Sequence, residues 1–202
     1  MLQSIFLTGV GGQGVITLAG LISERASEQG LRVSLFSSKG MAQRGGRVSS
    51  EIRLTDDPGL DFGARISTGR ADVLIGMEIG ESINSYSFLK PGGAAILLDY
   101  AHVPAGMILK RQPYPSFEQL KELYSAKAGS LLAVKEPRMP HNMFLLGVFA
   151  GAAPALNGEL AFYSDGNMEQ AIAGKLKRDL EQNLESFREG CEFGRSLLLQ
   201  PV

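Results

Sequence analysis

The first 37 residues alternate between short apolar runs and one periodic stretch. Residues 4–8 form an apolar run that stops at Gly9, as a buried parallel strand does when a glycine turn follows it. After Gly14 the apolar positions change to a helical period and share one face: Val15, Leu18, Ala19, Ile22 and Ala26. Gly30 is placed to end this helix, and residues 31–37 are typical of a second strand. This segment predicts a strand–helix–strand unit with a right-handed crossover.

The same alternation continues along the rest of the chain. Further strands are predicted at residues 48–54, 71–77, 94–98 and 131–134, and residues 90–93 are expected to turn the chain into the third of these. Helices are predicted near residues 79–86, after the Ser116–Gln119 capping box, over residues 142–152, and as one long amphipathic helix from 167 to about 187. Strands that alternate with helices indicate an α/β fold. We therefore expect one domain over residues 1–202, with a Rossmann-like, open, mostly parallel sheet flanked by helices.

Composition narrows the class of protein. Lys plus Arg number 20 and Asp plus Glu 21, so the net charge of −1 argues against a general nucleic-acid binder. No stretch has the roughly 18 apolar residues that span a bilayer, and the first residues do not resemble a secretory signal. The single cysteine, Cys191, cannot form an internal disulfide or hold an iron–sulfur cluster alone, and two histidines argue against structural zinc. A cytoplasmic domain that does not carry its own metal is expected.

A glycine loop follows the first predicted strand. Residues 9–14, Gly-Val-Gly-Gly-Gln-Gly, fit the G-x-G-x-x-G pattern, which leaves the first N–H groups of the next helix free to meet an anion. An NAD site usually has an acidic residue at the end of the second strand, but between Glu28 and Glu51 this chain has no carboxylate. Lys39 would instead suit a phosphorylated ribose, so an NADP site stays open. The simpler interpretation is that the glycines only allow close packing of helix on strand.

A basic loop follows the second predicted strand. Residues 37–47 contain Lys39, Arg44 and Arg47 together with three glycines, and the segment has no acidic residue to pair these cations. Ligands bind at the carboxyl ends of strands in open α/β sheets, and an arginine guanidinium suits a carboxylate or phosphate. The simpler interpretation is a solvated loop without a ligand.

Together the two loops resemble the gamma-type domain of the 2-oxoacid:ferredoxin oxidoreductases. The resemblance is carried by Gly11-Gly12-Gln13-Gly14 and by residues 40–46, Gly-Met-Ala-Gln-Arg-Gly-Gly. The Met-Ala-Gln form is most similar to the beta subunits of indolepyruvate ferredoxin oxidoreductases, whereas pyruvate-type members more often have Glu-Val before Arg-Gly-Gly. Further matches are residues 71–75 with Glu78, residues 89–93, and residues 142–147, so the similarity extends over about residues 3–190.

The resemblance implies a function in a complex. Members oxidatively decarboxylate a 2-oxoacid, transfer the acyl group to coenzyme A and pass two electrons to ferredoxin. Thiamine diphosphate, Mg²⁺ and the iron–sulfur clusters would lie on a larger partner subunit, and this chain would assist coenzyme A handling and assembly. By itself the chain would be inactive, with no catalytic residue and no metal, and a homodimer of the isolated chain is left open. Two alternatives are a stand-alone NADP-dependent oxidoreductase and a binding module without enzymatic activity.

The residues expected to contact a phosphorylated carrier come from the two loops. Arg44 is expected to be the strongest anion anchor and Gln13 to supply a polar contact, while Met41 would line the site or be buried. The full expected set is Gly11, Gly12, Gln13, Gly14, Lys39, Met41, Gln43, Arg44, Gly45, Gly46 and Arg47. The roles of Glu78, His102 and His141 stay open. Glu78 could either meet a ligand or the partner chain, or stand at a helix N-terminus, and His141 could either contact a partner or cap a helix.

Overall fold

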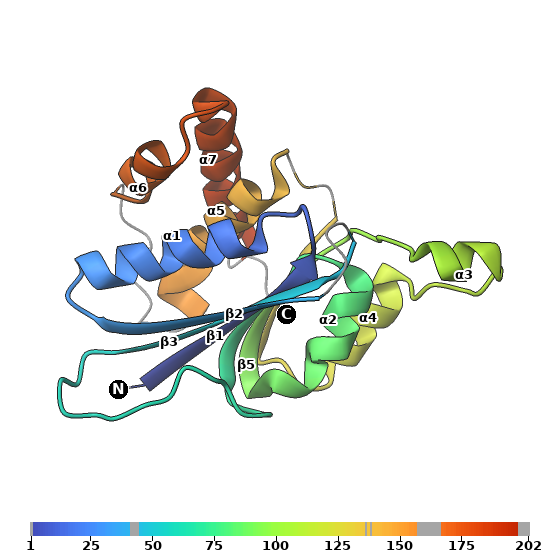
Figure 1. The fold of residues 1–202 in the computed structure, drawn as a ribbon, viewed down its shortest axis with the longest axis horizontal. Coiled ribbons are helices and arrows are strands. Elements are labelled where there is room, and N and C mark those ends of the chain that lie inside the picture. Colours follow the sequence, from blue (N-terminus) through green and yellow to red (C-terminus); the bar gives the residue numbers. More distant parts are fainter. Residues whose placement is uncertain (1, 41–44, 136, 138, 157–166, 198–202) are drawn as a thin grey trace.

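The computed structural model describes residues 2–40, 45–135, 137, 139–156 and 167–197. Its six strands form a single sheet in the order β2-β3-β1-β4-β5-β6 (Figure 1). Their bounds are β1 Leu2–Val10, β2 Arg32–Lys39, β3 Arg47–Thr55, β4 Ala71–Gly76, β5 Leu89–Leu98 and β6 Ser130–Val134. Strands β1, β4, β5 and β6 pair in parallel, and β3 is antiparallel to both of its neighbours. The predicted α/β fold with a mostly parallel sheet is confirmed.

Strand β3 lies between the two strands of the predicted strand–helix–strand unit. It pairs along its whole length with β1 on one side and with β2 on the other. The cause is the short connection between β2 and β3, residues 40–46, because a parallel return needs a crossover of about a dozen residues or more. As a result, β1 and β2 run in the same direction without being neighbours.

Helices cover both faces of the sheet (Figure 1). Helices α1 (Val15–Glu28), α5 (His141–Leu156), α6 (Asn167–Lys175) and α7 (Leu180–Leu197) pack on one face, and α2 (Ile79–Ser85) and α4 (Phe117–Ser125) pack on the other. Alternate strand residues supply the two cores, so Ile5 and Leu7 belong to the first and Phe6 to the second. No helix in the described ranges is long and apolar enough to cross a membrane.

Two predictions of secondary structure need correction, and one detail is confirmed. The prediction of one long helix from residue 167 to about 187 is wrong. Helix α6 ends at Lys175 and α7 begins at Leu180, and Asp179 between them has a left-handed φ of 51°. Leu176 and Leu180 both pack on the core, so the apolar period continues across the break. Residues 90–93 lie within β5, where pairing with β4 shifts from Leu89 to Ala94. The capping box of α4 is present, with Gln119 N–H donating to Ser116 Oγ at 3.2 Å.

Helices α5 and α7 cross in close contact through four glycines. Two are four residues apart on α5, Gly147 and Gly151, and two are four residues apart on α7, Gly190 and Gly194. A Cβ added to any of them would lie well under 3.0 Å from a backbone oxygen of the other helix. Small residues at this spacing therefore let the two backbones approach, and nothing flexible could yield to a larger side chain.

We predict that Gly147→Ala destabilises the protein. The new methyl group must displace the α7 backbone, so the free energy of unfolding should fall by about 2 kcal/mol or more in urea denaturation. Gly174→Ala is the matched control, because Gly174 is also helical but its Cβ would meet nothing within 4 Å. That variant should gain about 0.5–1 kcal/mol. Equal effects of the two substitutions would contradict the close α5–α7 packing.

Candidate functional site

The glycine loop is held by the side chain of Gln13. Its Oε1 accepts a hydrogen bond from Val10 N–H at 2.8 Å, and its Nε2 donates to the Met77 carbonyl at 2.6 Å. Met77 N–H in turn donates to Thr8 O at 2.8 Å, so the ends of β1 and β4 are joined. Gln13 thus fixes the shape of the loop, and its predicted contact with a phosphorylated carrier stays a prediction.

Glycine is required at the start of α1 by conformation and by space. Gly12 and Gly14 have φ of 101° and 78°, a region that favours glycine. A Cβ on Gly14 would also lie under 3.0 Å from the Asn142 side chain of α5. The N-terminal ends of α1 and α5 therefore meet at this loop.

A cavity of about 440 Å³ opens beside the first turn of α1. The N–H groups of Val15, Ile16 and Thr17 have no carbonyl four residues earlier within the helix, and the helix dipole adds partial positive charge there. The cavity is lined by Val10, Gly11, Gly12, Gly14, Val15, Ile16, Thr17, Lys39, Gly40 and Val48. Among the described residues that line it, the only ionisable one is the cation Lys39, so the arrangement suits an anion such as phosphate.

The basic loop is tied to the glycine loop. Gly11 N–H donates to the Gly46 carbonyl at 2.8 Å, and Gly40 N–H donates to the Arg47 carbonyl at 2.7 Å. Lys39 is exposed at the end of β2 and lines the cavity just described. The predicted site residues Met41, Gln43 and Arg44 lie outside the described residues. The structure therefore brings the described parts of both loops to the same edge of the sheet.

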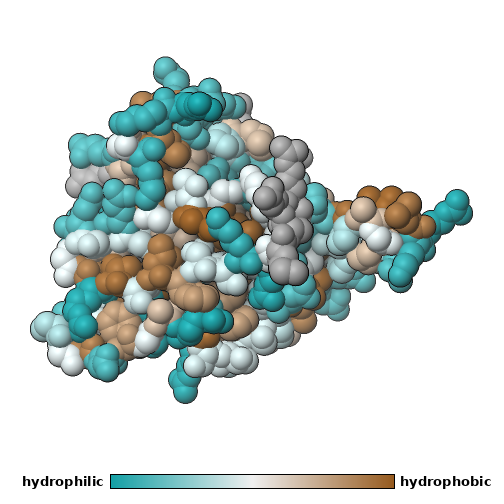
Figure 2. All heavy atoms as spheres, viewed as in Figure 1, coloured by the Kyte–Doolittle hydropathy of each residue, from teal (hydrophilic) through white to brown (hydrophobic). Residues whose placement is uncertain are grey.

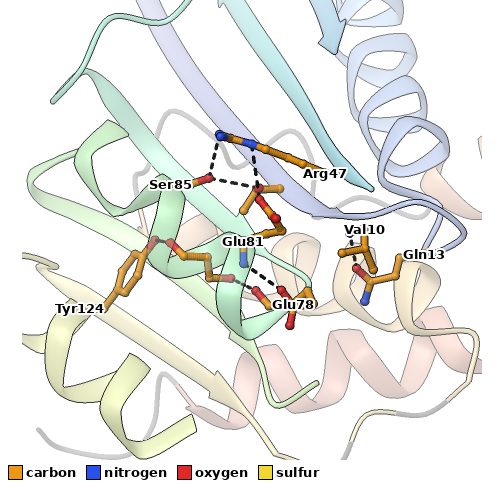
Figure 3. A network of polar contacts seen from close by, with 9 residues as sticks. Val10, Gln13, Arg47, Glu78, Glu81, Ser85 and Tyr124 are labelled. Carbon is orange, nitrogen blue, oxygen red and sulfur yellow. Dashed lines mark hydrogen bonds and ion pairs between the residues drawn. The ribbon is translucent and has the colours of Figure 1, made fainter. Parts of the chain in front are cut away.

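Arg47 has an acidic partner that the sequence of the loop does not reveal. Its Nε lies 3.5 Å from Glu81 Oε2 on α2, and its Nη2 donates to Ser85 Oγ at 3.4 Å (Figure 3). Burial raises the pKa of Glu81, and the nearby Arg47 charge opposes that rise. The basic loop has no acidic residue of its own, but the fold brings Glu81 from α2 next to Arg47. Arg47 is a partly neutralised residue that holds α2 against β3.

Glu78 is a buried carboxylate with three hydrogen-bond donors. It is 1% exposed, and its Oε2 caps α2 by accepting from Glu81 N–H at 2.8 Å. Its Oε1 accepts from His102 N–H at 3.0 Å and from the Tyr114 hydroxyl at 2.7 Å. Burial and the hydrogen bond to this carboxylate raise the pKa of Tyr114. Of the two roles considered for Glu78, the structure assigns it the helix N-terminal one.

A second cavity of about 470 Å³ lies on the other side of the glycine loop. His102 is exposed at its edge, and a Cβ on Gly45 would lie under 3.0 Å from its imidazole. His141 is the first residue of α5, and its ring meets Tyr100 edge-on with centroids 5.5 Å apart. Burial lowers the pKa of His141, which favours its neutral form. The cavity is lined by Val10, Gly11, Gly12, Gln13, Gly45, Tyr100, His102, Met139, Pro140, His141 and Asn142.

Sequence reasoning missed three residues that shape the site. Glu81 pairs with Arg47, Tyr114 donates to Glu78, and Asn142 packs on Gly14. Glu81 had a local signal, because it stands three residues after Glu78 at the start of a predicted helix, and Asn142 begins one of the segments that carry the resemblance. Within the described ranges, no three His, Cys, Asp or Glu side chains are grouped as metal ligands.

We predict that Glu78→Gln lowers stability without changing the size of the side chain. Glutamine replaces one acceptor oxygen with an NH₂ group, so at least one buried donor among Glu81 N–H, His102 N–H and Tyr114 Oη–H loses its partner. The free energy of unfolding should fall by about 1–3 kcal/mol. The exposed Glu122→Gln on α4 is the control and should stay within about 0.5 kcal/mol of the parent chain. A neutral result for Glu78→Gln would mean that these donors find other acceptors.

Comparison with known sequences gives matches over nearly the whole chain. The model of the family described as pyruvate ferredoxin/flavodoxin oxidoreductase matches residues 4–193. The indolepyruvate oxidoreductase subunit IorB of Methanothermobacter thermautotrophicus is 30% identical, over 94% of this chain and 96% of that protein. The IorB subunit of Archaeoglobus fulgidus is also 30% identical, over 94% of both chains.

Solved structures share the fold at lower identity. The gamma subunit of a keto/oxoacid ferredoxin oxidoreductase from Geobacter sulfurreducens has a TM-score of 0.61 at 19% identity, covering 98% of both chains. The 2-oxoglutarate:ferredoxin oxidoreductase of Magnetococcus marinus has a TM-score of 0.61 at 17% identity, covering 96% of this chain and 31% of its own. The family match over residues 4–193, with relatives of similar length, shows that this chain belongs to the pyruvate ferredoxin/flavodoxin oxidoreductase family.

Proposed function

We propose that this chain is the smaller subunit of an indolepyruvate:ferredoxin oxidoreductase. The observation that carries the proposal is the 30% identity, over nearly the full length of both chains, to subunits named IorB. The complex would oxidatively decarboxylate an aryl 2-oxoacid, form the acyl-coenzyme A and pass two electrons to ferredoxin. Thiamine diphosphate, Mg²⁺ and iron–sulfur clusters would be held by a larger partner subunit, and thiamine diphosphate supplies the carbanion chemistry when bound.

Within that complex the chain would help to bind coenzyme A. The cavity beside α1 offers the N–H groups of a helix N-terminus and the exposed Lys39, both of which favour phosphate oxygens. Gly11 and Gly12 leave the backbone open to close approach. Arg44 is proposed as a further anion contact, and no side chain of this chain is proposed to take part in bond making or breaking.

The NADP-dependent alternative depends on the same cavity, because Lys39 lines it together with the glycine loop. In the common dinucleotide fold, however, the second parallel strand lies next to the first. Here β3 occupies that place, and β2 is one strand further away. The isolated chain should therefore show no thermal shift with NADPH. A saturable shift that Lys39→Glu abolishes would favour the alternative.

The subunit proposal is tested by purifying the chain from its source cells without overexpression. A larger chain that contains thiamine diphosphate and iron–sulfur clusters should accompany it, and the complex should reduce ferredoxin with indolepyruvate and coenzyme A. The isolated chain should be inactive in the same assay. Full activity of the isolated chain, or its recovery without a thiamine-containing partner, would contradict the proposal.

Coenzyme A binding is tested in the assembled complex. Lys39→Glu should raise the KM for coenzyme A about tenfold, corresponding to about 1.4 kcal/mol, and leave the KM for the 2-oxoacid unchanged. Lys177→Glu, in the link between α6 and α7, is the charge-matched control and should change neither constant. Arg44→Ala should likewise raise the KM for coenzyme A with intact assembly. Loss of assembly in that variant would instead assign Arg44 to the subunit contact.

A further inference from the structure

Residues 102–114 form an arm that leaves the body of the protein. In Figure 1 its short helix α3 (Ala105–Leu109) projects away from the sheet and from the other helices. The arm is held together by its own backbone: Ile108 N–H donates to Pro104 O, and Gln112 N–H donates to Met107 O. Its shape is therefore defined locally, without support from the core.

One buried carboxylate closes the base of this arm. Glu78 Oε1 accepts from His102 N–H, where the arm begins, and from the Tyr114 hydroxyl, where it ends. Tyr114 also packs closely on α2, because a Cβ on Gly80 would lie under 3.0 Å from its hydroxyl. A single rigid acceptor thus fixes both ends, so the arm has a set direction of departure although its tip is in solvent.

The tip of the arm exposes apolar side chains. Ile108 is 63% exposed and Leu109 84%, which makes them the most exposed large hydrophobic residues in the described ranges. Figure 2 shows the hydrophobic patch on this projection, with hydrophilic side chains at its end. Lys110 and Arg111 follow directly, and no acidic residue occurs between Asp99 and Glu118. The arm is therefore apolar and basic. Its exposed aliphatic side chains contribute favourable free energy only when another surface buries them.

The arm begins beside the candidate site. His102 lines the second cavity and lies against Gly45 of the basic loop. Whatever covers the arm is therefore brought close to the glycine loop.

We propose that this arm docks in an apolar groove, edged by carboxylates, on the larger thiamine-containing subunit. The inference rests on the proposed function. It assigns a contact between the two subunits to the arm, residues 102–114. Charge argues against contact with the tip of a second copy, because Lys110 and Arg111 of the two arms would repel each other, and it predicts carboxylates on the partner. In the Magnetococcus marinus oxidoreductase, this fold covers only 31% of its chain and is thus joined to further polypeptide. Docking would place the larger subunit beside the glycine loop, whose residues Gly11 and Gly12 line both cavities.

Cross-linking within the intact complex tests the contact directly. A photoreactive phenylalanine analogue replaces Leu109, and in a matched variant it replaces Leu35, which is 42% exposed on the edge strand β2. Irradiation should join position 109 to the chain that contains thiamine diphosphate, identified by mass spectrometry of the linked peptides. Position 35 should give no such product. A cross-link from 109 to a second copy of this chain, or to any other protein, would overturn the proposal.

Affinity gives a second, independent readout. The double variant Ile108→Ser/Leu109→Ser should weaken assembly of the complex about a hundredfold, measured as the concentration at which the subunits separate on dilution. Its melting temperature as an isolated chain should be unchanged, because both side chains are in solvent. Lys110→Glu/Arg111→Glu should weaken assembly more at low salt than at high salt. Wild-type assembly by these variants would overturn the docking arm but leave the subunit proposal intact, whereas a wild-type chain without any larger partner would overturn both.

Discussion

The pairing of β3 with both β1 and β2 determines where everything else at the site can lie. Because β3 is antiparallel to both neighbours, its first residue stands beside the carboxyl ends of β1 and β2. The glycine loop after β1 and the basic loop before β3 are thereby forced to one edge. There the hydrogen bond from Gly11 N–H to Gly46 O joins them. A parallel strand in the same place would have taken the basic loop to another edge of the sheet.

Glu78 is the second organising group, because one side chain connects three parts of the molecule. It caps α2, fixes the start of the arm and fixes its end. Its neighbour Glu81 extends the network to Arg47 at the start of β3. Buried hydrogen bonds of this kind are strong only while every member keeps its partner. The base of the arm is therefore connected through α2 to Arg47 at the end of the basic loop.

The sequence predicted the strands better than the contacts between them. Each strand carried an apolar pattern of its own, and the Ser116–Gln119 capping box marked α4 correctly. The position of β3 could have been inferred from the length of the 40–46 link. The break between α6 and α7 could not be inferred from periodicity. Leu176 and Leu180, on either side of it, both pack on the core, as they would in one continuous helix. The Arg47–Glu81 pair and the Glu78 network join residues distant in sequence, which no local pattern encodes.

The electrostatics of the cavity beside α1 are consistent with the proposed function in a complex. Of the loop cations that the structure describes, Arg47 is partly neutralised by Glu81, whereas Lys39 has no carboxylate among the described residues as a partner. A helix N-terminus adds only about half an elementary charge. A carrier with several phosphate groups has more negative charge than these two sources neutralise. Under the proposed function, Arg44 and a surface of the larger subunit would supply the remainder.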